Sequence, residues 1–212
     1  MLIDRHPRIT LVAAVLIGLA LAASLRHLPP QTIDVGLSPV AQTAISDPGS
    51  PSVGAVNADV TIVVFTDYQC AICKATSAAL DQARLRDSNI RVIYKDLPIL
   101  GEDSHLAART ALAASFQGKY VPVHNALMQS RRRFDAAGVQ AVATNAGVDW
   151  ARLKADLRVH DAQIERQLDR HAAQAWSLGI EGTPAYLVGP LLVRGGLSTG
   201  ALSSVIAAAR RK

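Results

Sequence analysis

The chain has 212 residues, of which 50% are hydrophobic and only two are cysteine. This length fits one domain with an insertion or two small domains, and the hydrophobic content supports a core that needs no disulfide staples. The formal net charge is +5, but the lysines and arginines are dispersed except for the run Arg131-Arg132-Arg133. A run that short is typical of a solvated helix end, so the charge does not indicate a nucleic-acid partner.

Residues 1–25 have the pattern of an export signal. Arg5, His6 and Arg8 precede a stretch without charged residues at 9–25. A positive segment followed by an apolar one is typical of a signal peptide, and this stretch is also just long enough for a membrane span. A cleaved signal and an uncleaved anchor therefore both stay open. Either one places the remainder outside the cytoplasm, in the periplasm or cell envelope, because positively charged flanks stay on the cytoplasmic side.

Residues 26–56 are rich in proline, serine, glycine, glutamine and threonine, and they include the pair Pro29-Pro30. Such a composition is typical of a spacer. We therefore expect a linker between the N-terminal segment and a folded domain.

The rest of the chain predicts a sheet whose strands are separated by a block of helices. In chain order the pattern predicts a strand at residues 60–65, a helix at 74–86, a strand at 90–94, helices that open at Asp103 or Ser104, Pro122, Asp135 and Asp149, a long helix through Ile164 and Ala175, strands at 185–188 and 191–193, and a last helix through Leu202 and Ala209. This order indicates a mixed α/β domain interrupted by an all-helical insertion.

Cys70 and Cys73 are the only cysteines, and they stand between the first predicted strand and the first predicted helix. A Cys-x-x-Cys pair at such a junction is typical of a dithiol/disulfide redox site. As a structural disulfide it would close a very short loop and add little stability. At a helix start, unpaired N–H groups and the helix dipole stabilise a thiolate. We therefore expect Cys70 to be the exchange nucleophile and Cys73 the resolving thiol, with Lys74 either adding to the positive potential or lying on the surface.

A metal site is the alternative use of two cysteines. Zinc takes four ligands, and no histidine pair in the chain has the spacing of a zinc finger. Two thiolates alone can hold Cu(I), so a Cu(I)-binding or chaperone-like module stays open.

With these residues placed, the chain resembles the DsbA-type thiol:disulfide oxidoreductases of the thioredoxin-like superfamily. The stretches that carry the resemblance are FTDYQCAICK at 65–74, YKDLPILG at 94–101, the helical segments at 107–109, 117–120 and 124–128, and GTPA at 182–185. The similarity covers about residues 55–210.

The resemblance implies a thioredoxin-like fold with an inserted all-helical domain and no cofactor. The implied parts are a thioredoxin-like domain at 57–102 and 179–212 and a helical domain at 103–178. It also implies that Pro184 is cis and faces the active-site cysteines, with Thr183 beside it. Asp67 would tune the cysteines, relay protons or cap its loop.

The resemblance further implies exchange of disulfides with cysteines of exported proteins, with a membrane redox partner that re-oxidises or re-reduces the pair. One departure bears on the direction of exchange. Oxidising members usually have proline and then histidine or tyrosine between the cysteines, whereas this chain has Ala71 and Ile72. Ile72 cannot donate a hydrogen bond to the Cys70 sulfur. We expect an oxidase, with a disulfide reductase or isomerase as the alternative.

Overall fold

The computed structural model describes residues 15–18, 30–36 and 38–212. The signal or anchor predicted at 1–25 lies outside these residues except for 15–18, which are helical. Within the described ranges no helix is both long enough and apolar enough to cross a membrane. Residues 1–30 and 31–212 form two separate units, and the second contains the sheet and the helices from α2 onward.

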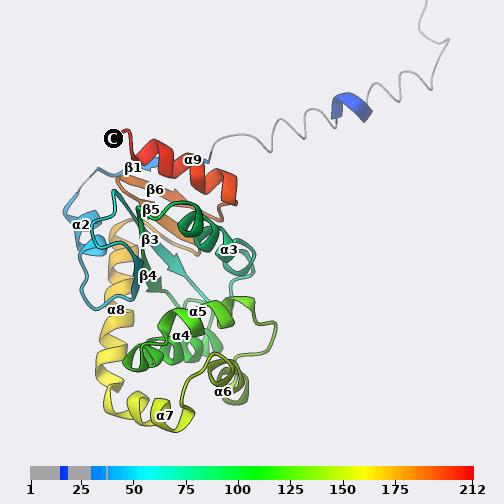
Figure 1. Cartoon of the computed structure of the whole chain (residues 1–212), viewed down its shortest axis with the longest axis vertical. Helices are drawn as coiled ribbons and strands as arrows, with labels where there is room; N and C mark the ends of the chain where they lie inside the picture. The colour runs from blue at the N-terminus through cyan, green and yellow to red at the C-terminus, as the bar shows by residue number, and fades with distance from the viewer. Residues whose placement is uncertain (1–14, 19–29, 37) are drawn as a thin grey trace, which may run out of the picture. The chain divides into compact units, whose positions relative to one another are not determined.

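A six-stranded mixed sheet forms the centre of this unit, in the order β1-β6-β5-β3-β4-β2 (Figure 1). The strands are β1 Ile33–Asp34, β2 Ser52–Gly54, β3 Val60–Thr66, β4 Ile90–Asp96, β5 Ala185–Val188 and β6 Leu191–Arg194. Strands β3 and β4 are parallel and are joined by α3, whereas every other pair is antiparallel. The β3-α3-β4 crossover brings the C-terminal ends of the two central strands to one edge of the sheet.

The helices are α2 Pro39–Ile45, α3 Ala71–Arg86, α4 Glu102–Ala114, α5 Tyr120–Gln129, α6 Ala136–Asn145, α7 Trp150–Val159, α8 Asp161–Ser177 and α9 Thr199–Ala209. Helices α4 to α8 follow one another between β4 and β5, as the sequence predicts. In Figure 1, α4 to α7 lie beyond the end of β4 at which α4 begins, while α8 runs back beside the sheet.

Both faces of the sheet are covered, which explains why its central strands are apolar without alternation. Ile62 and Val64 of β3 face a core shared with α3, α4, α5 and α9. Val63 and Phe65 point to the opposite face and pack in a second cluster with α2 and α8. Successive side chains of a strand point to opposite faces, so one strand supplies both cores.

Part of the predicted linker is folded. Residues 31–56 contain β1, which pairs with β6, the helix α2, and β2, which pairs with β4. Ala41 and Ala44 of α2 are fully buried against the sheet. Strands of two and three residues are too short to show periodicity, which is why composition alone indicated a spacer here.

The start of α4 also differs from the prediction. The helix begins at Glu102 after Gly101, whose φ of 100° lies in the region that favours glycine. Ser104 lies inside the first turn, where its hydroxyl donates to Asp67 instead of capping the helix. Asp135 and Asp149, by contrast, cap α6 and α7 through N–H bonds from Gly138 and Arg152, as predicted.

Candidate active site

Cys70 lies at the N-cap of α3, directly after the loop that leaves β3. Its backbone is extended, with φ −70° and ψ 115°, and its Sγ accepts a hydrogen bond of 3.1 Å from the Cys73 N–H. The side chain is 7% exposed. The sulfur therefore meets the unpaired N–H groups of the first helical turn, which is where a thiolate is stabilised.

Cys73 lies one turn further into α3 and is 2% exposed. Burial raises the pKa of its thiol to about 11, although the Asp67 backbone and the hydroxyls of Thr66 and Thr183 act in the opposite direction. Both cysteines are free thiols in this structure. Both cysteines are thus buried on the same helix face, three residues apart, and Cys73 is the more deeply buried of the two.

Thr183 and Pro184 lie against the cysteines although more than 100 residues separate them in sequence. The Cys70 thiol donates to the Thr183 carbonyl oxygen at 3.3 Å. The Thr183–Pro184 peptide bond is cis, and Pro184 leads directly into β5, which pairs with β3. The four residues singled out by the sequence therefore meet at one place, at the C-terminal end of β3.

The residues between the cysteines face outward. Ile72 is 55% exposed, and Ala71 is exposed as well. A Cβ on Gly196 would lie 2.7 Å from Cγ2 of Ile72, so the loop after β6 approaches this side chain closely. The apolar Ile72 side chain therefore offers the Cys70 sulfur no hydrogen-bond donor.

Asp67 holds the loop before the cysteines in place. Its carboxylate accepts hydrogen bonds from the N–H groups of Gln69, Ile99 and Leu100 and from the Ser104 hydroxyl, at 2.7 to 3.0 Å. These bonds tie the loop to the segment that follows β4. The sequence allowed Asp67 to tune the cysteines, relay protons or cap its loop, and the observed contacts are those of a residue that caps and fixes the loop.

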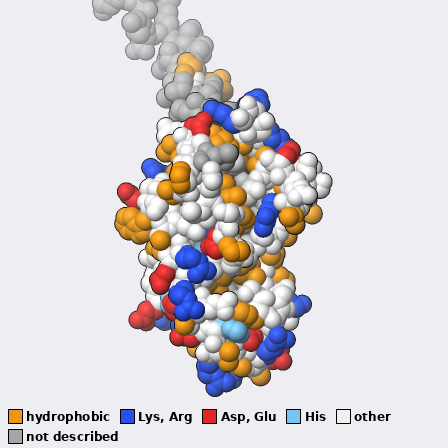
Figure 2. Space-filling model, turned by 90° about the vertical axis from the view of Figure 1, so that its left-hand side faces the viewer, with side chains coloured by type: hydrophobic (Ala, Val, Ile, Leu, Met, Phe, Trp, Pro, Cys, Tyr) orange, Lys and Arg blue, Asp and Glu red, His pale blue; other side chains and the backbone are white. Residues whose placement is uncertain are grey.

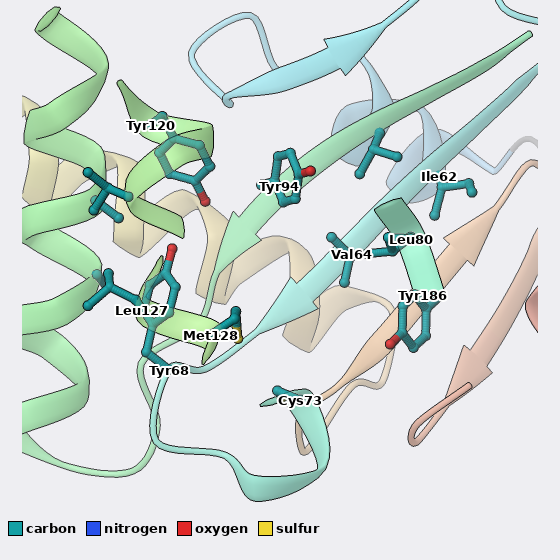
Figure 3. Packing of buried hydrophobic residues seen from close by; sticks show 14 of the residues in the cluster. Ile62, Val64, Tyr68, Cys73, Leu80, Tyr94, Tyr120, Leu127, Met128 and Tyr186 are labelled. Carbon is teal, nitrogen blue, oxygen red and sulfur yellow. The ribbon is translucent and has the colours of Figure 1, made fainter. Parts of the chain in front are cut away.

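A buried polar cluster that the sequence did not reveal lies beside this loop. The hydroxyls of Tyr68 and Tyr120 both donate to Asp96 Oδ1 at 2.9 Å, and Tyr68 is also 2.9 Å from His124 Nδ1. The two tyrosine hydroxyls point toward each other in Figure 3. The residues come from the active-site loop, the end of β4 and helix α5, so no local spacing connects them.

The charge state of this cluster is set by burial. Burial raises the pKa of Asp96 to about 7, and Oδ2 of this residue has no hydrogen-bond partner. Burial also lowers the pKa of His124 to about 3, so this imidazole is neutral near pH 7. No cation among these groups neutralises the carboxylate, which is therefore close to half-protonated at neutral pH.

Lys74 is neither a free surface lysine nor directed at the cysteines. Its Nζ donates to the Ser130 carbonyl oxygen at 2.7 Å and lies 4.6 Å from the centre of the Phe134 ring. Partial burial lowers the pKa of this lysine. The side chain thereby joins the first turn of α3 to the loop between α5 and α6.

Metal binding is the alternative use of the two cysteines. In the described part of the chain, no group of three or more His, Cys, Asp and Glu side chains is arranged to hold a metal ion. His124 and His171 are buried within the fold and bond to protein groups. Cu(I) needs only two thiolates, which Cys70 and Cys73 would supply.

Comparison with known proteins agrees with this geometry. The family model described as a DSBA-like thioredoxin domain matches residues 61–207. A thioredoxin-like oxidoreductase from Silicibacter pomeroyi DSS-3 is 35% identical and superposes with a TM-score of 0.76, covering 81% of this chain and 98% of that one. A periplasmic thioredoxin-like protein from Salmonella enterica serovar Typhimurium is 28% identical, with a TM-score of 0.74 and coverage of 83% and 99%. The thioredoxin-like fold inferred from the sequence is confirmed.

Curated relatives include Na⁺/H⁺ antiporters of the NhaA type. The one from Herminiimonas arsenicoxydans is 29% identical over 161 residues, which are 74% of this chain but 25% of that protein. The chain spans about a quarter of the length of the curated relatives it matches.

Proposed function

The chain belongs to the DSBA-like thioredoxin family of protein-disulfide oxidoreductases, and we propose that it exchanges disulfides with exported proteins outside the cytoplasm, acting as an oxidase. The observation that carries the proposal is the position of Cys70. Its sulfur meets the first turn of α3 on one side and the Thr183 carbonyl oxygen on the other. We assign Cys70 as the exchange nucleophile and Cys73 as the resolving thiol, with Thr183 and Pro184 as the wall against which the substrate lies.

The oxidase reaction proceeds through two thiol–disulfide exchanges. A substrate thiolate attacks Cys70 Sγ of the Cys70–Cys73 disulfide, which forms a substrate–Cys70 disulfide and releases Cys73 as a thiolate that takes up a proton. A second substrate thiolate then attacks the substrate sulfur of this bond, and Cys70 leaves as a thiolate. The substrate loses two electrons, which the enzyme holds as two reduced sulfurs until a membrane redox partner removes them.

The two sulfurs have different roles because their environments differ. Because burial raises the pKa of Cys73 to about 11, this residue is protonated near pH 7 and adds little stability to the reduced pair. The oxidising power then depends on how well the helix start holds the Cys70 thiolate. Ile72 supplies no hydrogen bond there, which favours a milder oxidant than a member with histidine at this position.

The location and the partners are part of the same proposal. The pattern at 1–25 supports export, and one similar solved structure is described as periplasmic. Substrates would be cysteine-containing exported proteins. The antiporter relatives share only a segment with this chain, so their ion transport does not enter the proposal.

We also propose the domain division predicted from sequence, with 57–102 and 179–212 as the thioredoxin-like domain and 103–178 as the helical insertion. The supporting observation is that α4 to α8 follow β4 without an intervening strand and precede β5. The thioredoxin-like part further includes β1, α2 and β2.

The first test uses the two cysteine variants. Cys70→Ser should abolish exchange with a disulfide-bearing peptide, because no thiolate then meets the substrate. Cys73→Ser should instead accumulate a mixed disulfide with the peptide, visible as a mass increase that a reductant removes. Full activity of Cys70→Ser, or stoichiometric Cu(I) binding by a wild type that performs no exchange, would overturn the proposal.

The reduction potential separates the oxidase from the alternatives. A disulfide donor should lie toward about −120 mV and a reductase toward about −270 mV. Replacing Ile72 by His offers a matched comparison, because it adds a donor beside Cys70 and should move the potential upward by tens of millivolts. A wild-type value at or below about −270 mV would assign the reductase direction instead.

A further inference from the structure

A groove begins directly beside the reactive cysteine and runs between α3 and α5. Its volume is about 530 Å³. Along α3 it is floored by Ala71, Ala75 and Ala78, which share one helix face at spacings of four and three residues. Asn125 and Met128 of α5 form part of the opposite side. Three alanines on one face leave the space that larger side chains would fill.

The groove is continuous with the site of exchange. Ala71 follows Cys70 directly and is exposed. The part of α3 that lines the groove extends from Ala71 to Asp81, which corresponds to about 15 Å along the helix. An extended polypeptide covers that length with about four or five residues. A substrate whose cysteine reaches Cys70 therefore has its neighbouring residues within reach of this groove.

The charges of the groove are predominantly positive. Lys74 and Arg131 line it, and the exposed Arg132 follows Arg131 in the same loop. In the part of the chain that the structure describes, neither arginine forms an ion pair. Asp81 also lines the groove, but Arg84 lies 3.9 Å from its carboxylate and offsets its charge. The short arginine run is exposed and directly follows Ser130, the C-cap of α5.

Charges of both signs are mixed on another face of the molecule. The face shown in Figure 2 carries acidic and basic side chains interspersed with hydrophobic ones. On α8, for example, Arg166 is flanked along the chain by Glu165 and Asp169. Arg131 lines the groove that begins beside Cys70, and neither it nor the adjacent Arg132 has an ion-pair partner among the described residues.

We propose that this groove between α3 and α5 binds the segment of the substrate polypeptide that flanks its reactive cysteine, and that Arg131 and Arg132 select acidic segments. The inference rests on the proposed exchange activity and adds a substrate class to it. Charge complementarity of this kind acts on encounter and orientation, and it weakens as salt screens the charges. A preference for acidic substrates should therefore be strongest at low ionic strength.

The test measures attack by Cys70 alone. In a Cys73→Ser background Cys70 is the only thiol. Three peptides carry one cysteine as a mixed disulfide with thionitrobenzoate, and the residues two to five positions from that cysteine are acidic, neutral or basic. The Cys70 thiolate attacks the peptide sulfur, which forms a Cys70–peptide disulfide and releases one thionitrobenzoate anion, whose absorbance gives the rate.

We expect the acidic peptide to react about tenfold faster than the basic one at low salt, and the ratio to shrink as salt is added. Arg131→Glu/Arg132→Glu should bring the ratio to about one or below. Arg158→Glu/Arg166→Glu is the matched control, since both residues are exposed, lie on other elements and change the net charge equally. This control should keep the ratio within about twofold of its original value.

The outcomes separate the two proposals. If no peptide reacts, the exchange activity itself fails. If all three peptides react at the same rate, exchange stands and the selection of acidic segments fails. If both charge variants lose the ratio equally, net charge and not the groove determines the preference, and the inference is again overturned. Circular dichroism of each variant establishes that it is folded before its rates are compared.

Discussion

Two neighbouring residues at the end of β4 point to opposite faces of the sheet and enter two different buried polar clusters. Lys95 faces α2 and α8, where its Nζ donates to Asp47 Oδ2 at 3.0 Å and to Ser50 Oγ at 2.7 Å. Asp96 faces the active-site loop and accepts from Tyr68 and Tyr120. Lys95 is thus paired with an opposite charge, whereas Asp96 has only neutral donors.

The difference decides how each group titrates. Burial alone would raise the pKa of Asp47, but the hydrogen bond and charge of Lys95 bring it down to about 2. Asp96 has no such cation, and burial raises its pKa to about 7. In the paired cluster, Asp47 therefore stays ionised over the physiological range. The unpaired one changes its charge near neutral pH, beside the loop that carries Cys70.

The largest expected effect comes from breaking the buried pair. Lys95→Met removes the buried cation of Asp47 and leaves only the half-exposed Arg170, 3.8 Å away, beside the carboxylate. We expect it to lower the free energy of unfolding by about 3–5 kcal/mol in urea denaturation. Lys95→Met/Asp47→Leu removes both buried charges and should recover most of that loss, because the charge that loses its partner, Arg170, is half-exposed. A double variant as unstable as the single one would show that the ion pair is not what ties the segment before β2 to the sheet.

The two clusters also show what the sequence could and could not predict. The redox role of Cys70 and Cys73 could be predicted because their short spacing at a strand-to-helix junction is a local signal. Thr183 and Pro184 were found only through the family pattern, since nothing local links them to the cysteines. Apolar periodicity predicted the strands and helices because the residues that carry it are adjacent along each element.

The polar clusters could not be predicted in this way. Lys95 and Asp96 carry charged side chains at the end of an apolar strand, and their partners Asp47 and Tyr120 lie in distant segments. The start of α2 could have been predicted from Ser38 followed by Pro39, because serine caps a helix and proline fits its first turn. The composition of the whole segment concealed it.

The second expected effect concerns the unpaired acid. A carboxyl group whose pKa is higher in the folded than in the unfolded protein binds more protons when folded, so its contribution to stability is present at low pH. That contribution is lost as the pH rises from about 4 to about 7. Relative to Asp96→Asn, the wild type should therefore lose on the order of 3–4 kcal/mol across this range.

The comparison between wild type and variant is essential here. Burial lowers the pKa of both His124 and His171 to about 3, so these neutral imidazoles make the fold more stable as the pH rises from about 3 to 6.5. In the stability curve of either protein, the contribution of the two histidines changes with pH in the opposite direction to that of Asp96. It cancels when the free energy of unfolding of the variant is subtracted from that of the wild type. Urea denaturation of both proteins at a series of pH values gives that difference. A difference that does not change with pH would contradict the assignment of Asp96 as the unpaired group.

The smallest expected effect comes from removing one of the neutral hydroxyls that hydrogen-bond to Asp96. Tyr120→Phe removes one of the two hydroxyls that donate to Asp96 Oδ1. A hydrogen bond to a charged group contributes about 1.5–3 kcal/mol, and one to a neutral group about 1 kcal/mol. The loss of stability should thus be greater above pH 8, where the carboxylate is ionised, than below pH 6. Tyr94→Phe is the matched control, since the Tyr94 hydroxyl forms no hydrogen bond with the described residues and its ring packs against Tyr120. The control should cost little at either pH, and an equal pH dependence in both variants would mean that Tyr120 does not stabilise the ionised form of Asp96.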